Sequence, residues 1–155
     1  MDKNVVIRDI DRGFKRLLKM KSKLPKGVQA GITSDKVNDK GENLAKIATT
    51  NEYGDPSRKI PERPFMRLTF EENKEDFYAK LQKFIKNYSK NRMLDPNKFF
   101  KTLGLFMQTK IQKKTTQSSQ WAVANAPSTI AAKGSSKPLI DTGRMRASVT
   151  NDIIK

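Results

Sequence analysis

Two long amphipathic segments in the middle of the chain constrain its fold more than any other feature. From Phe65 to Tyr88, large apolar residues recur at three- and four-residue steps, which is the period of an α-helix with one buried face. A second helix with such a stripe is expected to run to about Lys114. Asp95 is its expected N-cap and Pro96 its expected first residue. The break between the segments is short, which predicts that the two helices pair antiparallel. The stripes consist of Phe70, Phe77, Leu81, Phe84, Ile85 and Tyr88, and of Phe99, Phe100, Leu103, Phe106, Met107 and Ile111.

Shorter patterns on either side predict the remaining elements. Apolar residues at helical spacing predict a helix over residues 5–22, and another over residues 42–53 with Gly54 as its C-terminal cap. Alternating apolar and polar residues predict strands at 28–33 and 148–154, which can pair with each other. Two strands alone are marginal, so we expect packing on a helix, or pairing with a neighbouring subunit, to complete the sheet.

Residues 115–138 differ in composition from the rest of the chain. They are mainly Ser, Thr, Ala, Gln, Gly and Lys around a lone Trp121, and they show no clean period of either kind. Long loops are uncommon in compact domains unless they are functional or disordered. We therefore expect a flexible arm that a partner orders by burying Trp121 and Ile130, with Lys133 and Lys137 as further interface candidates. The alternative, in which Trp121 packs on its own domain, stays open.

Together these elements predict one α+β domain over residues 1–155. Amphipathic helices are expected to pack on a small, mainly antiparallel sheet, with the long flexible arm before the C-terminal strand. The proline-rich residues 55–64 cannot continue a helix and are expected to form an exposed connection. Asp141 or Thr142 is expected to cap a single helical turn at residues 143–147.

The chain is strongly basic, with 32 lysine and arginine residues against 16 aspartate and glutamate residues and a formal net charge of +16. It has no cysteine and no histidine, which excludes thiolate chemistry, disulfides and the commonest general base. We therefore expect a protein that is not an enzyme and that uses no cofactor. Its charge favours polyanionic partners, either nucleic acid or an acidic protein surface.

Four carboxylates near the start of the first long helix raise the hypothesis of a metal site. Acidic residues at this position are more often a solvated turn that the helix dipole stabilises, so we expect no metal there. The residues are Glu71, Glu72, Glu75 and Asp76.

The sequence offers no candidate for membrane association. It has no run of about 18 apolar residues, and its first residues lack the basic-then-apolar order of a secretory signal. We expect synthesis in the cytosol and no membrane partner.

Two motifs stand out. The first is Asn51-Glu52-Tyr53-Gly54, followed by Ile60-Pro61-Glu62-Arg63-Pro64-Phe65-Met66-Arg67. The second begins with Pro127-Ser128-Thr129-Ile130, passes through Lys133-Gly134, and ends in Pro138-Leu139-Ile140-Asp141-Thr142-Gly143-Arg144-Met145-Arg146-Ala147-Ser148-Val149. In this order and spacing the pair resembles the virion morphogenesis proteins of tailed bacteriophages, also called tail-completion or neck proteins. The resemblance spans residues 28–150.

The resemblance implies a structural virion protein that acts through assembly at the head-to-tail junction or the tail end. It also implies a ring, commonly sixfold, which forms when the protein docks on a tail tube or connector. The implied partners are other copies of the chain and other neck and tail proteins, such as the connector, the tail terminator or the tail tube, with DNA in the channel as a further contact. The implied location is the virion neck or tail, after assembly in the host cytoplasm.

The motif residues also have a purely structural interpretation. Arg63 and Pro64 suit a helix start, and Gly54 suits the end of the preceding helix. In the second motif, Leu139 and Ile140 would anchor the return of the arm, and Asp141, Thr142 and Gly143 would form a capped turn. Arg144 and Arg146 are expected to project outward, which makes them the better interface candidates.

The alternative function is a basic nucleic-acid-binding protein that uses its lysine-rich helices and arm. The Phe residues of this chain lie on the expected core stripes and not on an exposed stacking platform, and no recognition motif such as helix-turn-helix is present. These observations count against nucleic-acid binding, and the family resemblance favours the virion protein.

Overall fold

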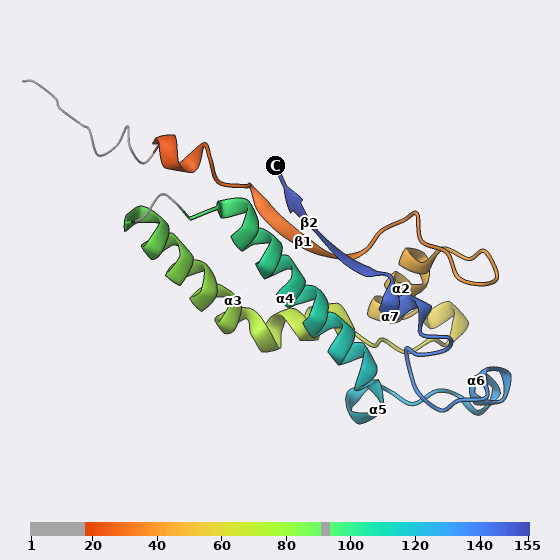
Figure 1. Ribbon diagram of the computed structural model, residues 1–155. Helices are drawn as coiled ribbons and strands as arrows, with labels where there is room; N and C mark the ends of the chain where they lie inside the picture. The colour runs from red at the N-terminus through yellow and green to blue at the C-terminus, as the bar shows by residue number, and fades with distance from the viewer. Residues whose placement is uncertain (1–17, 91–93) are drawn as a thin grey trace, which may run out of the picture.

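A hairpin of two long helices is the largest unit of the fold. The computed structural model describes residues 18–90 and 94–155. In it, α3 (Phe65–Lys90) and α4 (Pro96–Thr116) lie side by side and antiparallel (Figure 1), as the two apolar stripes predict. Asp95 is the N-cap of α4, because its Oδ1 accepts the backbone N–H of Asn97 at 2.9 Å.

Stacked aromatic rings hold the far end of this hairpin together. The rings of Phe84 on α3 and Phe99 on α4 are stacked, with centroids 4.0 Å apart. Tyr88, one helical turn further along α3, also stacks on Phe84, with centroids 5.5 Å apart. Two members of the expected stripe are not buried, since Phe70 is 40% and Ile85 50% exposed. The apolar stripe of α3 is wider than the surface that α4 covers, so its edges remain accessible.

A two-stranded antiparallel sheet, β1 (Gly27–Ile32) and β2 (Val149–Ile154), packs on α4 (Figure 1). The predicted pairing of these two segments is confirmed, with Gly27 opposite Ile154 and Ile32 opposite Val149. The described part of the arm adds no strand to this sheet.

Gly104 in the middle of α4 allows this close packing. A Cβ at this position would lie 2.6 Å from Val28 Cγ2 on β1 and 2.6 Å from Asn151 Oδ1 on β2. A larger residue would therefore push the sheet away from the helix. The gain in helix propensity from an alanine here is opposed by the overlap that it would create.

The remaining elements gather around one end of the hairpin. They are α2 (Leu44–Tyr53), the 3₁₀ turn η1 (Pro56–Arg58), α5 (Ser118–Trp121), α6 (Pro127–Lys133) and α7 (Arg144–Ala147). In Figure 1, α2 and α7 lie together near one end of the sheet, and α5 and α6 lie below the end of α4. The mixture of helices and an antiparallel sheet confirms the expected α+β class.

The predicted helix over residues 5–22 lies mostly outside the described residues. Within the described part, residues 18–21 are helical and the helix ends before Pro25, as expected. The predicted helix over residues 42–53 begins at Leu44, because the Asn43 side chain caps it by accepting the backbone N–H of Lys46.

The expectation that residues 115–138 form a loop is wrong. α4 continues to Thr116, and the rest of the segment contains α5 and α6. Ser118 is fully buried, and its hydroxyl donates to the carbonyl of Pro138, which ties the two ends of the segment together. The arm therefore contains two short helices and is tied to itself at its ends, which its composition does not indicate because polar side chains make these contacts.

The expected cap of the last helical turn is also wrong. The N-cap of α7 is Gly143, in a left-handed conformation with φ 81°, and no side chain caps this helix. Asp141 and Thr142 are exposed in the turn before it. The turn places the glycine, and not a polar side chain, at the position where the helix begins.

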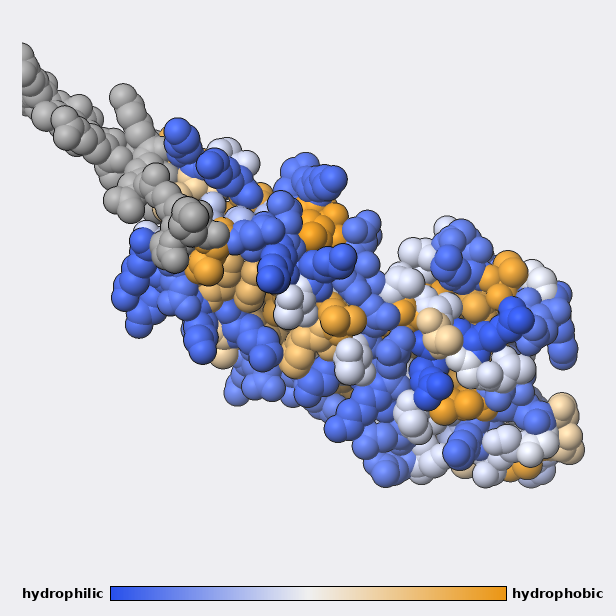
Figure 2. Space-filling model, in the orientation of Figure 1, coloured by the Kyte–Doolittle hydropathy of each residue, from blue (hydrophilic) through white to orange (hydrophobic). Residues whose placement is uncertain are grey.

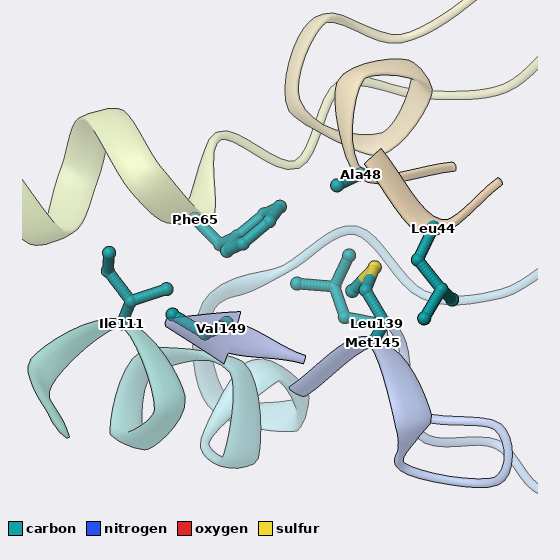
Figure 3. Close-up of a cluster of buried hydrophobic side chains, with 7 residues drawn as sticks. All are labelled: Leu44, Ala48, Phe65, Ile111, Leu139, Met145 and Val149. Atoms are coloured by element: carbon teal, nitrogen blue, oxygen red, sulfur yellow. The ribbon is translucent and has the colours of Figure 1, made fainter. Parts of the chain in front are cut away.

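The central core joins elements from the whole described chain (Figure 3). Phe65 at the start of α3 is 0% exposed and Val149 at the start of β2 is 1% exposed. The cluster consists of Leu44, Ala48, Phe65, Ile111, Leu139, Met145 and Val149. Four of these seven residues belong to the two sequence motifs, so the motifs build the core where α2, α3, α4, α7 and β2 meet.

Candidate interaction site at the motif junction

The first motif forms a junction between the end of α2 and the start of α3. Glu52 is only 4% exposed, and its two carboxylate oxygens accept the backbone N–H groups of Met66 and Arg67, each at 2.9 Å. These N–H groups belong to the first turn of α3, where no intrahelical partner exists. A side chain from one helix thus caps the N-terminus of the next, and its charge suits the helix dipole there.

Arg67 completes the junction on its solvent side. Its guanidinium bonds to the Glu52 carboxylate at 3.2 Å and the Glu52 carbonyl at 2.8 Å, and it pairs with Glu62 at 2.5 Å. The hydrogen bonds that Arg67 donates to Glu62 and then to Glu52 raise its pKa, although burial acts in the opposite direction. Tyr53, which is 63% exposed, lies with its ring 4.9 Å from the same guanidinium.

Gly54 ends α2, as expected, and its backbone has φ 72°. A Cβ at this residue would lie 2.9 Å from two backbone atoms, the nitrogen of Glu62 and the carbonyl oxygen of Ile60. The chain can pass back against itself at this point only because the glycine has no side chain.

We expect Gly54→Ala to lower the free energy of unfolding by about 2 kcal/mol or more, since strain at a positive φ is added to a clash with rigid backbone. Chemical denaturation followed by circular dichroism measures this change. Gly134→Ala is the matched control, because Gly134 has φ 67° but nothing lies within 4 Å of its added Cβ. Equal losses in the two variants would show that the close approach at Gly54 has no cost.

Arg63 connects the junction to the arm. It is 6% exposed, and its guanidinium donates to the carbonyls of Val123 at 2.8 Å and Ala124 at 3.2 Å, and to Asn125 Oδ1 at 3.3 Å. Its backbone N–H donates to the carbonyl of Asn51 at 2.7 Å. Burial lowers the pKa of Arg63. The expectation that residues 55–64 are an exposed connection is therefore wrong at Arg63, whose buried charge requires these partners.

We expect Arg63→Met to release residues 122–126 from the body of the protein. Methionine keeps most of the apolar volume but removes every donor to the two carbonyls, so the segment loses its anchors. Hydrogen exchange should become faster at the amides of residues 122–126 while the amides of α3 and α4 keep their protection. Unchanged exchange in this segment would contradict the anchoring role of Arg63.

The second motif supplies buried groups and one strained residue. Leu139 is 9% exposed and has φ 60°, an uncommon conformation for a residue other than glycine. Its side chain points into the core beside Met145 (Figure 3), which agrees with its expected role as the anchor of the returning arm. Ile140 is partly buried.

The structure separates the six expected interface residues into packed and accessible ones. Trp121 packs against the core cluster, and its indole N–H donates to the carbonyl of Lys114 at 3.0 Å, so the structure favours the alternative in which it serves its own domain. Ile130 is partly buried on α6. The Lys133 amine donates to the carbonyl of Lys137 at 2.9 Å, while Lys137 itself is exposed. Burial lowers the pKa of Lys133. The charge of Asp141 opposes this shift, and the charge of Arg63 adds to it.

The two arginines of α7 are exposed, as expected, but each has a partner within the chain. Arg144 pairs with Asp39 at 2.5 Å, with about half of each side chain exposed. Arg146 donates to the hydroxyl of Thr116 at 3.3 Å. No local pattern in the sequence indicates Asp39, because the loop that brings it to α7 is far from Arg144 in the sequence.

The described residues contain no group of three or more acidic side chains arranged to hold a metal ion. None of the helices described is long and apolar enough to cross a membrane. Comparison with known proteins finds no matching family model, no similar curated protein and no similar solved structure.

Proposed function

We propose that this chain is a structural virion protein of a tailed bacteriophage, which acts in tail completion or head-to-tail joining as one subunit of a ring. The observation that carries the proposal is the resemblance of two separate motifs to one family, together with the way these motifs meet in the structure. Phe65 from the first motif and Leu139, Met145 and Val149 from the second share one core. The motifs therefore act as one unit, as expected if the resemblance extends to the fold.

The chemistry of the motif residues also supports a role in assembly. The charged groups of Glu52 and Arg63 form hydrogen bonds of 2.8–3.2 Å with backbone atoms of other segments. Charged groups used in this way fix the shape of the subunit. The face in Figure 2 is mainly hydrophilic, with a band of apolar side chains over the helix hairpin and smaller apolar patches elsewhere. Such a surface suits contacts that form with a particular partner during assembly.

The test is to purify virions or tails and look for the chain in them, first by mass spectrometry and then in a cryo-electron-microscopy map. We expect several copies in a ring at the neck or at the end of the tail. Particles that are complete and infectious without the chain would contradict the proposal. A position in the capsid shell would contradict it as well.

Nucleic-acid binding is the second candidate, and one surface feature favours it. The amines of Lys80 on α3 and Lys110 on α4 lie 5.0 and 5.2 Å from the centroid of the Phe106 ring. Two cations beside one ring could contact the phosphates of a nucleic acid. If they do, Lys80→Glu with Lys110→Glu should weaken DNA binding and reduce its salt dependence. Lys46→Glu on α2 is the control, because Lys46 is an exposed lysine on a different helix.

A further inference from the structure

One edge of the sheet borders an apolar groove. The sheet has only two strands among the described residues, so each strand has a hydrogen-bonded neighbour on one side only. A groove of about 210 Å³ lies beside the free edge of β1. Its lining comes from Val28 to Ala30 on β1, from Met66, Phe70 and Phe77 on α3, and from Gly104, Met107 and Ile111 on α4. The groove includes no residue of β2, which places it between β1 and α3 with α4 as its floor.

The edge of β1 lacks the features that normally prevent pairing with another strand. Natural edge strands carry charges, prolines or bulges that oppose such pairing. β1 reads Gly-Val-Gln-Ala-Gly-Ile, with no charged residue and no proline, and it pairs with β2 in continuous register. By contrast, β2 carries Asp152. The unprotected edge is thus the one beside the apolar groove.

We propose that this groove binds an extended, acidic segment of a partner protein, which adds a third strand to the sheet at the edge of β1. The main chain of the segment would satisfy the free backbone groups of β1. Alternate side chains of the segment would point toward the groove floor and pack against Phe70, Phe77 and Met107. The proposal concerns the partner of this surface and does not depend on the virion function.

Charge identifies the occupant. The chain carries a net charge of +16, and exposed lysines flank the groove: Lys26 immediately precedes β1, and Lys101 lies one helical turn before Gly104 on α4. A second copy of the chain could offer the free edge of its own β2, but it would bring the same positive charge, including Lys155 directly after that strand. Acidic residues on the solvent side of the added strand would be attracted to these lysines, whereas a second copy would be repelled.

A synthetic peptide of alternating glutamate and valine tests the proposal. Its binding to the full chain is measured by fluorescence anisotropy at low salt. Its position is measured by changes in the NMR signals of the backbone amides of β1. We expect saturable binding that perturbs residues 27–32. A peptide with lysine in place of glutamate should bind at least about tenfold more weakly. An acidic peptide with N-methyl groups on alternate residues should also bind at least about tenfold more weakly, because one of its backbone edges cannot donate hydrogen bonds.

Phe70→Asp should weaken binding of the acidic peptide by about tenfold or more, because it places a carboxylate in the groove wall. Ile85→Asp is the matched control, since Ile85 is on the same helix, is 50% exposed and does not line the groove. Thermal unfolding confirms that both variants fold. Equal binding of the acidic, basic and N-methylated peptides would overturn the proposal. Self-association of the wild-type chain that Phe70→Asp abolishes would overturn it in favour of a second copy.

Discussion

Replacing Glu52 with alanine is expected to lower the free energy of unfolding by about 3 kcal/mol, an unusually large effect for one glutamate. The carboxylate is buried and accepts two backbone N–H groups in the first turn of α3. Alanine leaves both groups inside the protein without a partner and also removes an anion from the positive end of the helix dipole. Urea denaturation followed by circular dichroism measures the loss.

Glu62→Ala is the control for this experiment, because Glu62 pairs with the same Arg67 but is about half exposed. Removing an exposed ion pair should cost about 1 kcal/mol or less. Glu52→Gln should fall between the two variants, because the amide keeps one acceptor but turns an NH2 group toward the donors around it. If Glu52→Ala costs no more than Glu62→Ala, the capping role assigned to Glu52 is wrong.

Phe65→Ala is expected to have an effect at least as large, about 3 to 5 kcal/mol. The side chain is 0% exposed and lies at the centre of the cluster in Figure 3, between residues from α2, α4 and β2. Its removal leaves a cavity that rigid helices on several sides cannot close. The loss should appear as a lower denaturation midpoint with a nearly unchanged dependence on denaturant, since the two-state transition and the surface exposed on unfolding stay similar.

Phe70→Ala is the control on the same helix, because Phe70 is 40% exposed and borders the open groove. This variant should lower the free energy of unfolding by only about 1 kcal/mol, since much of the Phe70 surface is already in water. Similar losses for the two phenylalanines would show that the centre of the core is not where the structure places it.

The long helices could be predicted from the sequence because the residue patterns that define them are local. The α3 and α4 stripes repeat over many turns, and the Asp95-Pro96 pair marks a helix start through residues that touch each other. The pairing of the two strands was also predictable, since both segments alternate apolar and polar residues and are similar in length. Phe70 shows where such reasoning ends, because a stripe indicates an apolar face but not how much of that face another helix covers.

Contacts between distant segments could not be predicted in the same way. Glu52 caps a helix that begins 13 residues later, beyond a proline-rich connection, and Arg63 binds carbonyls about 60 residues away. Both residues were identified as parts of a motif, but nothing local indicates which atoms they reach. The arm shows the same limit, because single contacts of Ser118 and Trp121, without any repeat along the sequence, hold it on the body.

The pairing of β1 with β2 has a consequence for how the chain folds. The two strands lie about 120 residues apart in the sequence, so the sheet requires closure of a very long loop, whereas the α3–α4 hairpin needs only neighbouring segments. We expect the hairpin to form early and the sheet to close last. During synthesis on the ribosome, β1 must wait for β2 with its backbone unpaired and the sheet-facing side of α4 open to water. During that interval the nascent chain is most prone to aggregation and most dependent on chaperones.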